Sequence, residues 1–252
     1  MADLTLIIAG LFLPLFPLSM VFNTLFSRIT NNKQRNILLL LWPQIGLLLI
    51  YFADTEIPDW LAIWGLLTAL LYGFRLLAIR EMKLWISFLA TSTWAILWVT
   101  LHYSGDNSPI YIYALSFSVP LILLLLLSDE LEQRFGAAYT GIYGGLALTQ
   151  PRLSGVLVMV VLAVAATPLF PAFFTMLATV MQATASSLIV AISTGIVWLL
   201  WSWAGALLLQ GTIVGPANET NIADLNTSST RKYVAALISL IIIGLVLIGG
   251  LP

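Results

Sequence analysis

Residues 110–128 read IYIYALSFSVPLILLLLLS, a stretch without one charged side chain. A helix that crosses the hydrocarbon layer of a membrane needs about 20 mostly apolar residues, and this stretch has that length. The rest of the chain is of the same kind, because 60% of its 252 residues are apolar and only 8% are charged. Soluble proteins carry about 25% charged residues. The sequence therefore predicts an all-α polytopic membrane protein.

Divided where charges, Pro and Gly cluster, the chain contains eight apolar stretches, and we expect eight transmembrane helices. We also expect two halves, an N-terminal membrane half (1–127) and a C-terminal membrane half (128–252). The stretches are Leu4–Ser27, Ile37–Ala53, Trp60–Ile79, Leu84–Tyr103, Ile110–Ser128, Ser154–Met181, Ser187–Gly211 and Tyr233–Gly250.

The positions of the charged residues indicate how these helices are oriented. All ten basic residues lie at or after the exit of an odd-numbered stretch. Basic connections face the cytoplasm, so we expect both termini on the outer side. The basic residues are Arg28, Lys33, Arg35, Arg75, Arg80, Lys83, Arg134, Arg152, Arg231 and Lys232, and the alternate connections carry Asp54, Glu56, Asp59 and Asp106.

Composition also excludes several kinds of chemistry. The chain has no cysteine and a single histidine, His102, so disulfides, thiolate metal sites and a two-histidine metal site are excluded. Ten basic against eleven acidic residues leave no basic surface for nucleic acid. We therefore expect no metal, no cofactor and no nucleic-acid partner, with the lipid bilayer as the surroundings.

Ionisable residues deep in a membrane mark ion or proton pathways, but this chain places few of them there. Arg75 is the deepest, about one turn from the inner end of its stretch, and can extend to the surface. His102 lies at the outer end of the fourth stretch near Asp106. A water-facing interfacial histidine is the preferred interpretation, and a proton relay is the alternative.

A second group of charges lies at the inner end of the fifth stretch. Asp129, Glu130 and Glu132 precede Arg134, and Arg152 follows in the same connection. A solvated helix end with local ion pairs is the preferred interpretation. The alternative is a proton-entry site or a site at which these five residues dock a partner.

Two prolines predict a break in the long sixth stretch. Pro168 and Pro171 lie near its centre, and proline removes a backbone donor and clashes with the preceding turn. Broken helix at membrane depth is tolerated only when it is buried in protein or lines a cavity. Thr167, Thr175 and Gln182 are the polar candidates for a solute site there, although hydroxyls in transmembrane helices often bond to their own helix.

Small residues recur every four positions around the start of the seventh stretch. Ala183, Ser187, Ala191 and Gly195 are expected on one helix face, where another helix can approach closely. The pattern indicates packing within the chain or against a partner.

The segment from Tyr143 to Leu153, YGGLALTQPRL, resembles the antiporter-like subunits of respiratory complex I and Mrp-type cation/proton antiporters. In that family a Gly-Gly-Leu loop leads into a helix broken at mid-membrane, followed by a Phe and an ionisable residue. Pro168 matches the break and Phe173 matches the Phe. The LWSWAGALLLQ run at 200–210 and the final helix also fit. The resemblance covers residues 128–252 and implies a shortened relative.

This chain departs from the family pattern at Met176, the position that corresponds to the ionisable residue. Methionine cannot hold a proton. The resemblance therefore implies the scaffold of a proton-conducting transporter without its charge-carrying side chains.

Two functions follow as hypotheses. The first is an accessory, non-charge-carrying membrane subunit, not itself an enzyme, of a proton-motive-force-coupled complex. Its partners would be a full-length antiporter-like membrane subunit and a cytoplasmic enzyme subunit. Its location would be the bacterial inner membrane. A system for uptake of inorganic carbon (CO2 or bicarbonate) is one candidate complex. The second is a stand-alone transporter of a small neutral solute.

Overall fold

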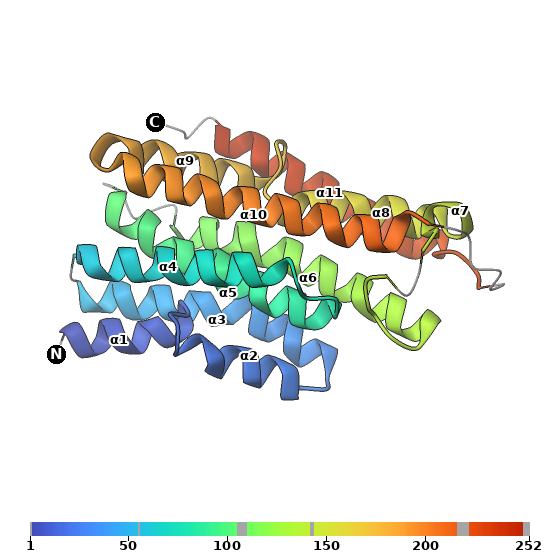
Figure 1. Ribbon diagram of the computed structural model, residues 1–252, viewed down its shortest axis with the longest axis horizontal. Coiled ribbons are helices and arrows are strands. Elements are labelled where there is room, and N and C mark those ends of the chain that lie inside the picture. The colour runs from blue at the N-terminus through green and yellow to red at the C-terminus, as the bar shows by residue number, and fades with distance from the viewer. Residues whose placement is uncertain (1, 55, 105–109, 142–143, 216–221, 249–252) are drawn as a thin grey trace.

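The computed structural model describes residues 2–54, 56–104, 110–141, 144–215 and 222–248. In these residues the chain forms eleven helices that lie roughly side by side in an elongated bundle (Figure 1). They are α1 (Ala2–Phe12), α2 (Ser19–Arg28), α3 (Asn32–Ala53), α4 (Asp59–Leu76), α5 (Met82–Tyr103), α6 (Ile110–Phe135), α7 (Leu146–Thr149), α8 (Pro151–Val164), α9 (Pro171–Ser186), α10 (Leu188–Ile213) and α11 (Thr227–Ile248).

The helices follow the predicted stretches closely. Six stretches each coincide with one helix, whereas the first is divided between α1 and α2 and the sixth between α8 and α9. Five helices, α3, α5, α6, α10 and α11, are long and apolar enough to cross a membrane. The all-helical membrane class is therefore confirmed. The expected division between residues 127 and 128 falls inside α6.

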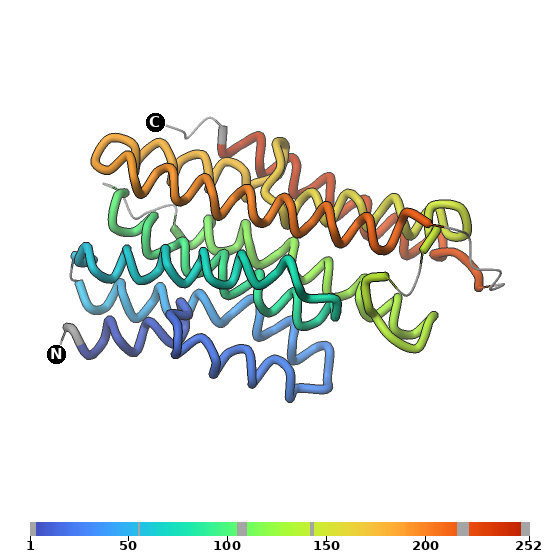
Figure 2. The backbone as a smooth tube through the Cα atoms, in the orientation of Figure 1, coloured from blue at the N-terminus to red at the C-terminus, as the bar shows by residue number. Residues whose placement is uncertain are grey.

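The expectation of one continuous helix over Leu4–Ser27 is wrong. Helix α1 ends at Phe12 and α2 begins at Ser19. The chain leaves the helix here because Pro14 and Pro17 cannot donate backbone hydrogen bonds. The tube in Figure 2 shows this interruption and a second one between α8 and α9. The bundle therefore contains two broken helices.

Neighbouring helices run in opposite directions along the bundle. The connections α2–α3, α4–α5, α6–α8 and α10–α11 lie at one end (right in Figure 1), and α3–α4, α5–α6 and α9–α10 lie at the other. The ten basic residues belong to the first set of connections or to the helix turns beside them. We call this the basic end of the bundle.

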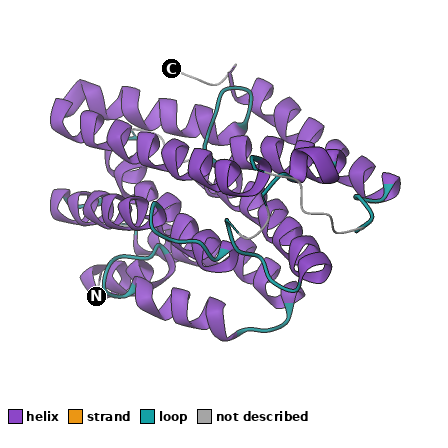
Figure 3. Ribbon diagram, turned by 45° about the vertical axis from the view of Figure 1, so that its right-hand side comes forward, coloured by secondary structure: helices purple, strands orange, loops and turns teal. Residues whose placement is uncertain are grey.

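Helix α5 occupies the centre, because the other helices surround it. Of its most apolar segment, 94% is buried, because α2, α4, α6 and α9 pack against it. Figure 3 shows the bundle from a second direction. The outer helices carry exposed apolar side chains, including Ile189 and Leu199 on α10 and Phe74 on α4. An apolar exterior around a buried centre is what a lipid environment requires.

Helix α4 packs tightly against α5 at Gly65. A Cβ atom at this position would lie 2.7 Å from the carbonyl oxygen of Ala95 and 2.8 Å from Cβ of Trp98. Both atoms belong to the rigid part of α5 and cannot move away. Only glycine permits this approach. By contrast, a Cβ at Gly195 on α10 would meet no atom within 4 Å.

We therefore predict that Gly65→Ala lowers the free energy of unfolding by about 1–3 kcal/mol, the usual cost of overpacking. Gly195→Ala is the matched control and should not lower it, because alanine favours helix over glycine. Unfolding of the purified variants in detergent, followed by circular dichroism, measures both. Equal stability of the two variants would contradict the packing shown here.

Candidate functional site

The second broken helix is the strongest candidate for a functional site. Helix α8 ends at Val164 and α9 begins at Pro171, so the expected break at Pro168 and Pro171 is confirmed. Pro171 is buried at the start of α9, whereas Pro168 is exposed in the connection. Ala166 and Leu169 have φ angles of +54° and +88°, a left-handed conformation that costs energy for residues with a side chain.

The polar backbone at this break is satisfied from inside the chain. The indole Nε1 of Trp198 on α10 donates to the Ala166 carbonyl oxygen at 3.0 Å. The Leu162 carbonyl accepts from the backbone nitrogen and the hydroxyl of Thr167 at 3.2 and 2.9 Å. The ring of Phe173 contacts Trp198 with centroids 5.3 Å apart. Phe173 and Trp198 thus close the break on one side.

Helix α11 closes the break on another side. A Cβ atom at Gly244 would lie 2.6 Å from the Leu169 carbonyl oxygen. Glycine therefore lets the α11 backbone approach the connection. The break is held by α10 and α11 together.

Hydroxyl groups connect α9 to the centre of the bundle. The hydroxyl oxygens of Thr175 and Ser116 on α6 lie 2.9 Å apart, and those of Thr179 and Thr100 on α5 also lie 2.9 Å apart. All four residues are buried. Thr175 and Thr179 also lie 3.3 and 2.8 Å from carbonyl oxygens of α9 itself. These hydroxyls are used in packing the three helices.

Met176 lies between the two threonines in the chain and is fully buried. The position that would carry an ionisable residue in the resembled family is therefore filled by an apolar side chain. Gln182, farther along α9, has a buried side-chain oxygen without a hydrogen-bond partner among the described residues. The side chains described around α9 are therefore polar or apolar but uncharged. They provide hydroxyl groups and an amide, and no fixed charge.

The charges on α6 at the basic end are paired within the chain. Lys83 on α5 lies 3.4 Å from Asp129 and also contacts Glu132. Glu130 pairs with Arg134 at 3.2 Å. Asp129 is buried rather than solvated, which is possible because the Lys83 ammonium compensates its charge. Sequence reasoning did not single out Lys83, since only the fold brings α5 beside α6.

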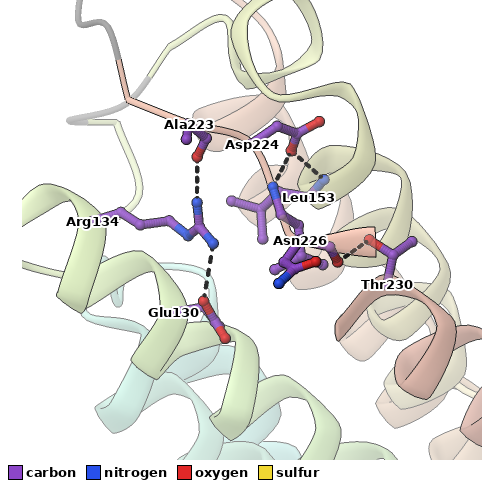
Figure 4. Close-up of polar contacts among 8 residues, drawn as sticks. Glu130, Arg134, Leu153, Ala223, Asp224, Asn226 and Thr230 are labelled. Carbon is purple, nitrogen blue, oxygen red and sulfur yellow. Dashed lines mark hydrogen bonds and ion pairs between the residues drawn. The ribbon is translucent and has the colours of Figure 1, made fainter. Parts of the chain in front are cut away.

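Arg134 also connects α6 to the α10–α11 connection. Figure 4 shows its guanidinium between the carboxylate of Glu130 and the carbonyl oxygen of Ala223, to which it donates a hydrogen bond. Beside it, the Asp224 carboxylate accepts from the backbone nitrogens of Arg152 and Leu153 at 2.9 and 3.2 Å. Asp224 thereby caps the start of α8, a role the sequence did not reveal.

His102 lies at the opposite end of the bundle, where it joins α5 to α4. Its Nε2 is 2.8 Å from the Asp59 carboxylate and its Nδ1 is 2.6 Å from the Ile57 carbonyl oxygen. The ring is 19% exposed, so it is partly open to the surroundings while both of its nitrogens contact groups of the chain. Asp106, the expected neighbour, lies outside the described residues. His102 also lines a hollow of about 910 Å³.

Arg75 lies in the last turn of α4 and is exposed. Its guanidinium carbon is 4.8 Å from the ring centroid of Phe88, a cation–π distance. The expectation that this side chain extends to the membrane surface stays a prediction.

The small-residue pattern does not form one face of one helix. Ala183 belongs to α9, and the helix ends before Ser187, whose extended backbone begins α10. Ser187 caps α10 by accepting from the Val190 nitrogen at 3.5 Å. Of the two remaining residues, Ala191 is buried. The expected stripe is wrong because a turn divides it.

Glycines permit the backbone conformation and the close packing of the Gly-Gly-Leu loop at the basic end. Gly145 precedes α7 with a φ of +77°. A Cβ at Gly215, after α10, would lie 3.0 Å from the Cα of Gly144. The loop thus packs its backbone directly against the end of α10. Tyr143, which also belongs to the quoted segment, lies outside the described residues.

Comparisons with known proteins agree on one family. The family described as "NADH:quinone oxidoreductase/Mrp antiporter, TM" matches residues 33–201. Among solved structures, a chain of respiratory complex I from Thermus thermophilus with bound NADH is 18% identical, with a TM-score of 0.84 over 95% of this chain and 53% of that one. No curated protein matches by sequence.

Two further structures are similar. A chain of the Mrp complex from Dietzia sp. DQ12-45-1b is 14% identical, with a TM-score of 0.82 over 97% of this chain and 56% of that one. A chain of the membrane-bound sulfane sulfur reductase, an archaeal respiratory membrane complex, is also 14% identical, with a TM-score of 0.81 over 94% and 50%. These likenesses concern the fold, and the chain spans about half the length of each.

The contact between Trp198 and Ala166 leads to a prediction about the break. Trp198→Phe removes the indole donor and leaves a buried carbonyl without its partner, so it should lower the free energy of unfolding by about 1–3 kcal/mol. Trp203→Phe is the matched control, because Trp203 on the same helix is 64% exposed. It should change stability by less than about 0.5 kcal/mol. Unfolding in detergent distinguishes them, and similar losses in both variants would refute the role of this hydrogen bond.

Proposed function

Because the chain belongs to the NADH:quinone oxidoreductase/Mrp antiporter membrane family, we propose that it is an accessory membrane subunit of a complex of this kind. In this role it packs beside a full-length antiporter-like subunit and carries no protons itself. Catalysis and charge transfer belong to its partners. The proposal is supported by the fold that this chain has in common with a chain of complex I and a chain of the Mrp complex.

One observation carries this proposal, namely the neutral interior around α9. Met176 is fully buried, and the polar groups beside it are the hydroxyls of Thr175 and Thr179, which are bonded to α6 and α5. Proton or ion transfer through a membrane depends on ionisable groups within it. A scaffold with hydroxyls and methionine at this place favours a supporting role.

The alternative is a stand-alone transporter of a small neutral solute. Its candidate site consists of Thr167, Thr175 and Gln182. The hydroxyls of Thr167 and Thr175 are occupied by contacts inside the chain. Only the Gln182 oxygen is left without a hydrogen-bond partner in this set. The accessory role therefore remains our first choice.

Among possible complexes, we name an inorganic-carbon uptake complex as the first to test. The family resemblance implies that such a system pairs an antiporter-like protein with an enzyme subunit. A chain with one histidine and no cysteine offers no zinc site of its own, so that chemistry would belong to the enzyme. We propose the basic end, with residues 129–152, as the surface that meets this cytoplasmic partner.

We further propose eight membrane crossings, with α1–α2 and α8–α9 each making one interrupted crossing. The basic end then faces the cytoplasm, following the positive-inside rule. The bacterial inner membrane is the corresponding location.

We expect the tagged chain, solubilised from its native host in mild detergent, to copurify with a full-length antiporter-like subunit in stoichiometric amount. Mass spectrometry of the other bands identifies the enzyme subunit and hence the complex. Membranes without the tagged chain are the control for nonspecific recovery. Recovery of a monodisperse chain alone, together with solute flux in liposomes that contain only this chain, would replace the accessory role with the transporter alternative.

The orientation can be tested with single cysteines, because the natural chain contains none. Glu56→Cys and Ser228→Cys place a thiol at opposite ends of the bundle, and both positions are exposed. In intact cells a membrane-impermeant maleimide should label Glu56→Cys, and it should label Ser228→Cys only after the inner membrane is permeabilised. The reverse pattern would invert the proposed topology, and labelling of both in intact cells would disprove the crossing count.

A further inference from the structure

A groove between α8 and α11 lies at the basic end, beside the surface proposed above for a cytoplasmic partner, and shares Arg152 with it. Its volume is about 340 Å³. Arg152 comes from the first turn of α8, and the other lining residues come from the first half of α11. They include Thr227, Thr230, Arg231, Val234 and Ile238. The groove therefore has a polar, positively charged part and an apolar part.

The two arginines supply charge that the chain does not neutralise. Among the described residues, neither Arg152 nor Arg231 has an ion-pair partner. The guanidinium of Arg152 donates to the Thr227 hydroxyl at 3.0 Å, which holds it across the groove. The nearby Asp224 carboxylate is occupied by backbone nitrogens, including that of Leu225 at 2.6 Å. The groove thus offers two guanidinium groups to an anion.

The apolar part continues away from the arginines along α11. Val234, Ile238, Ile242 and Leu245 are exposed and are spaced by three or four residues, so they lie on one face of the helix. From 234 to 245 the helix rises about 16 Å, at about 1.5 Å per residue. That is about half the thickness of the hydrocarbon layer. The length fits one acyl chain of one leaflet.

We propose that this groove binds an anionic phospholipid, with its phosphate between Arg152 and Arg231 and an acyl chain along Val234 and Ile238. Guanidinium groups bind phosphate through paired hydrogen bonds. Basic pockets between transmembrane helices are the usual place where anionic lipid headgroups bind. A free phosphate would use the arginines but not the apolar row. The continuity of the two parts therefore favours a lipid.

The test uses the full chain purified in neutral detergent and titrated with dioleoylphosphatidylglycerol, with native mass spectrometry counting bound lipid. Dioleoylphosphatidylcholine and inorganic phosphate are the comparison ligands. We expect preferential binding of the anionic lipid. Arg231→Gln should weaken that binding about fivefold, since one basic residue near a membrane surface contributes about 1 kcal/mol. Arg152→Gln together with Arg231→Gln should weaken it about 25-fold.

Three further variants distinguish a specific loss of lipid binding from a general loss of folding. Arg231→Lys retains the charge but not the paired donors, so it should weaken binding less than Arg231→Gln does. Lys232→Gln removes a neighbouring charge that does not line the groove, so it should have a clearly smaller effect than Arg231→Gln. Ile238→Ser should weaken binding of the lipid but not of inorganic phosphate, because it changes only the apolar part.

Several results would overturn the proposal. Equal binding of the two lipids, or equal lipid binding by the natural chain and the double variant, would exclude an anionic-lipid site. Binding of inorganic phosphate at the arginines without lipid preference would assign the groove to small anions. Loss of a protein subunit from the purified complex on Arg231→Gln, with bound lipid unchanged, would assign it to a protein interface.

Discussion

The structure depends on how backbone groups are satisfied where helices are interrupted. In hydrocarbon an unpaired carbonyl costs several kcal/mol because no water can bind it. Indole groups supply donors at both breaks. Trp98 and Trp64 donate to the carbonyls of Leu13 and Phe16 at 2.9 and 2.7 Å, and Trp198 donates to Ala166 at 3.0 Å. Tryptophan suits this task because it presents a single donor on a large apolar ring.

The same principle governs the polar side chains of the interior. Some buried hydroxyls in the centre of the bundle have partners on other helices, as Ser92 does with Trp201 at 2.8 Å and Ser118 with Trp94 at 3.2 Å. Such contacts specify which helices lie side by side, because dispersion between apolar helices has little directional preference. Charged residues are placed differently: among the described residues, Lys83 pairs with Asp129 at the basic end, and His102 contacts Asp59 at the opposite end of the bundle. Neutral groups thus organise the interior, and charged groups fix the ends.

The sequence predicted those features that depend on local pattern. Apolar length located the helices, and the prolines at 168 and 171 located one break. Pro14 and Pro17 give the same signal in the first stretch, so that break was also within reach of sequence reasoning. The pairing of Lys83 with Asp129, the cap formed by Asp224 and the bond of His102 to Asp59 were not. Each joins segments whose proximity only tertiary packing creates. The small-residue pattern failed because spacing alone does not reveal the turn at Ser187.

The length of two helices has a consequence for how a neighbour would meet this protein. Helices α6 and α10 contain 26 residues each, which corresponds to about 39 Å, against a hydrocarbon thickness of about 30 Å. Each of them is therefore longer than the hydrocarbon layer is thick, and when it stands upright its ends reach the headgroup zone. The acids of α6 lie within its last two turns. A protein that binds at the ends of these helices would contact turns that are already ordered, so little conformational entropy of this chain would be lost on binding.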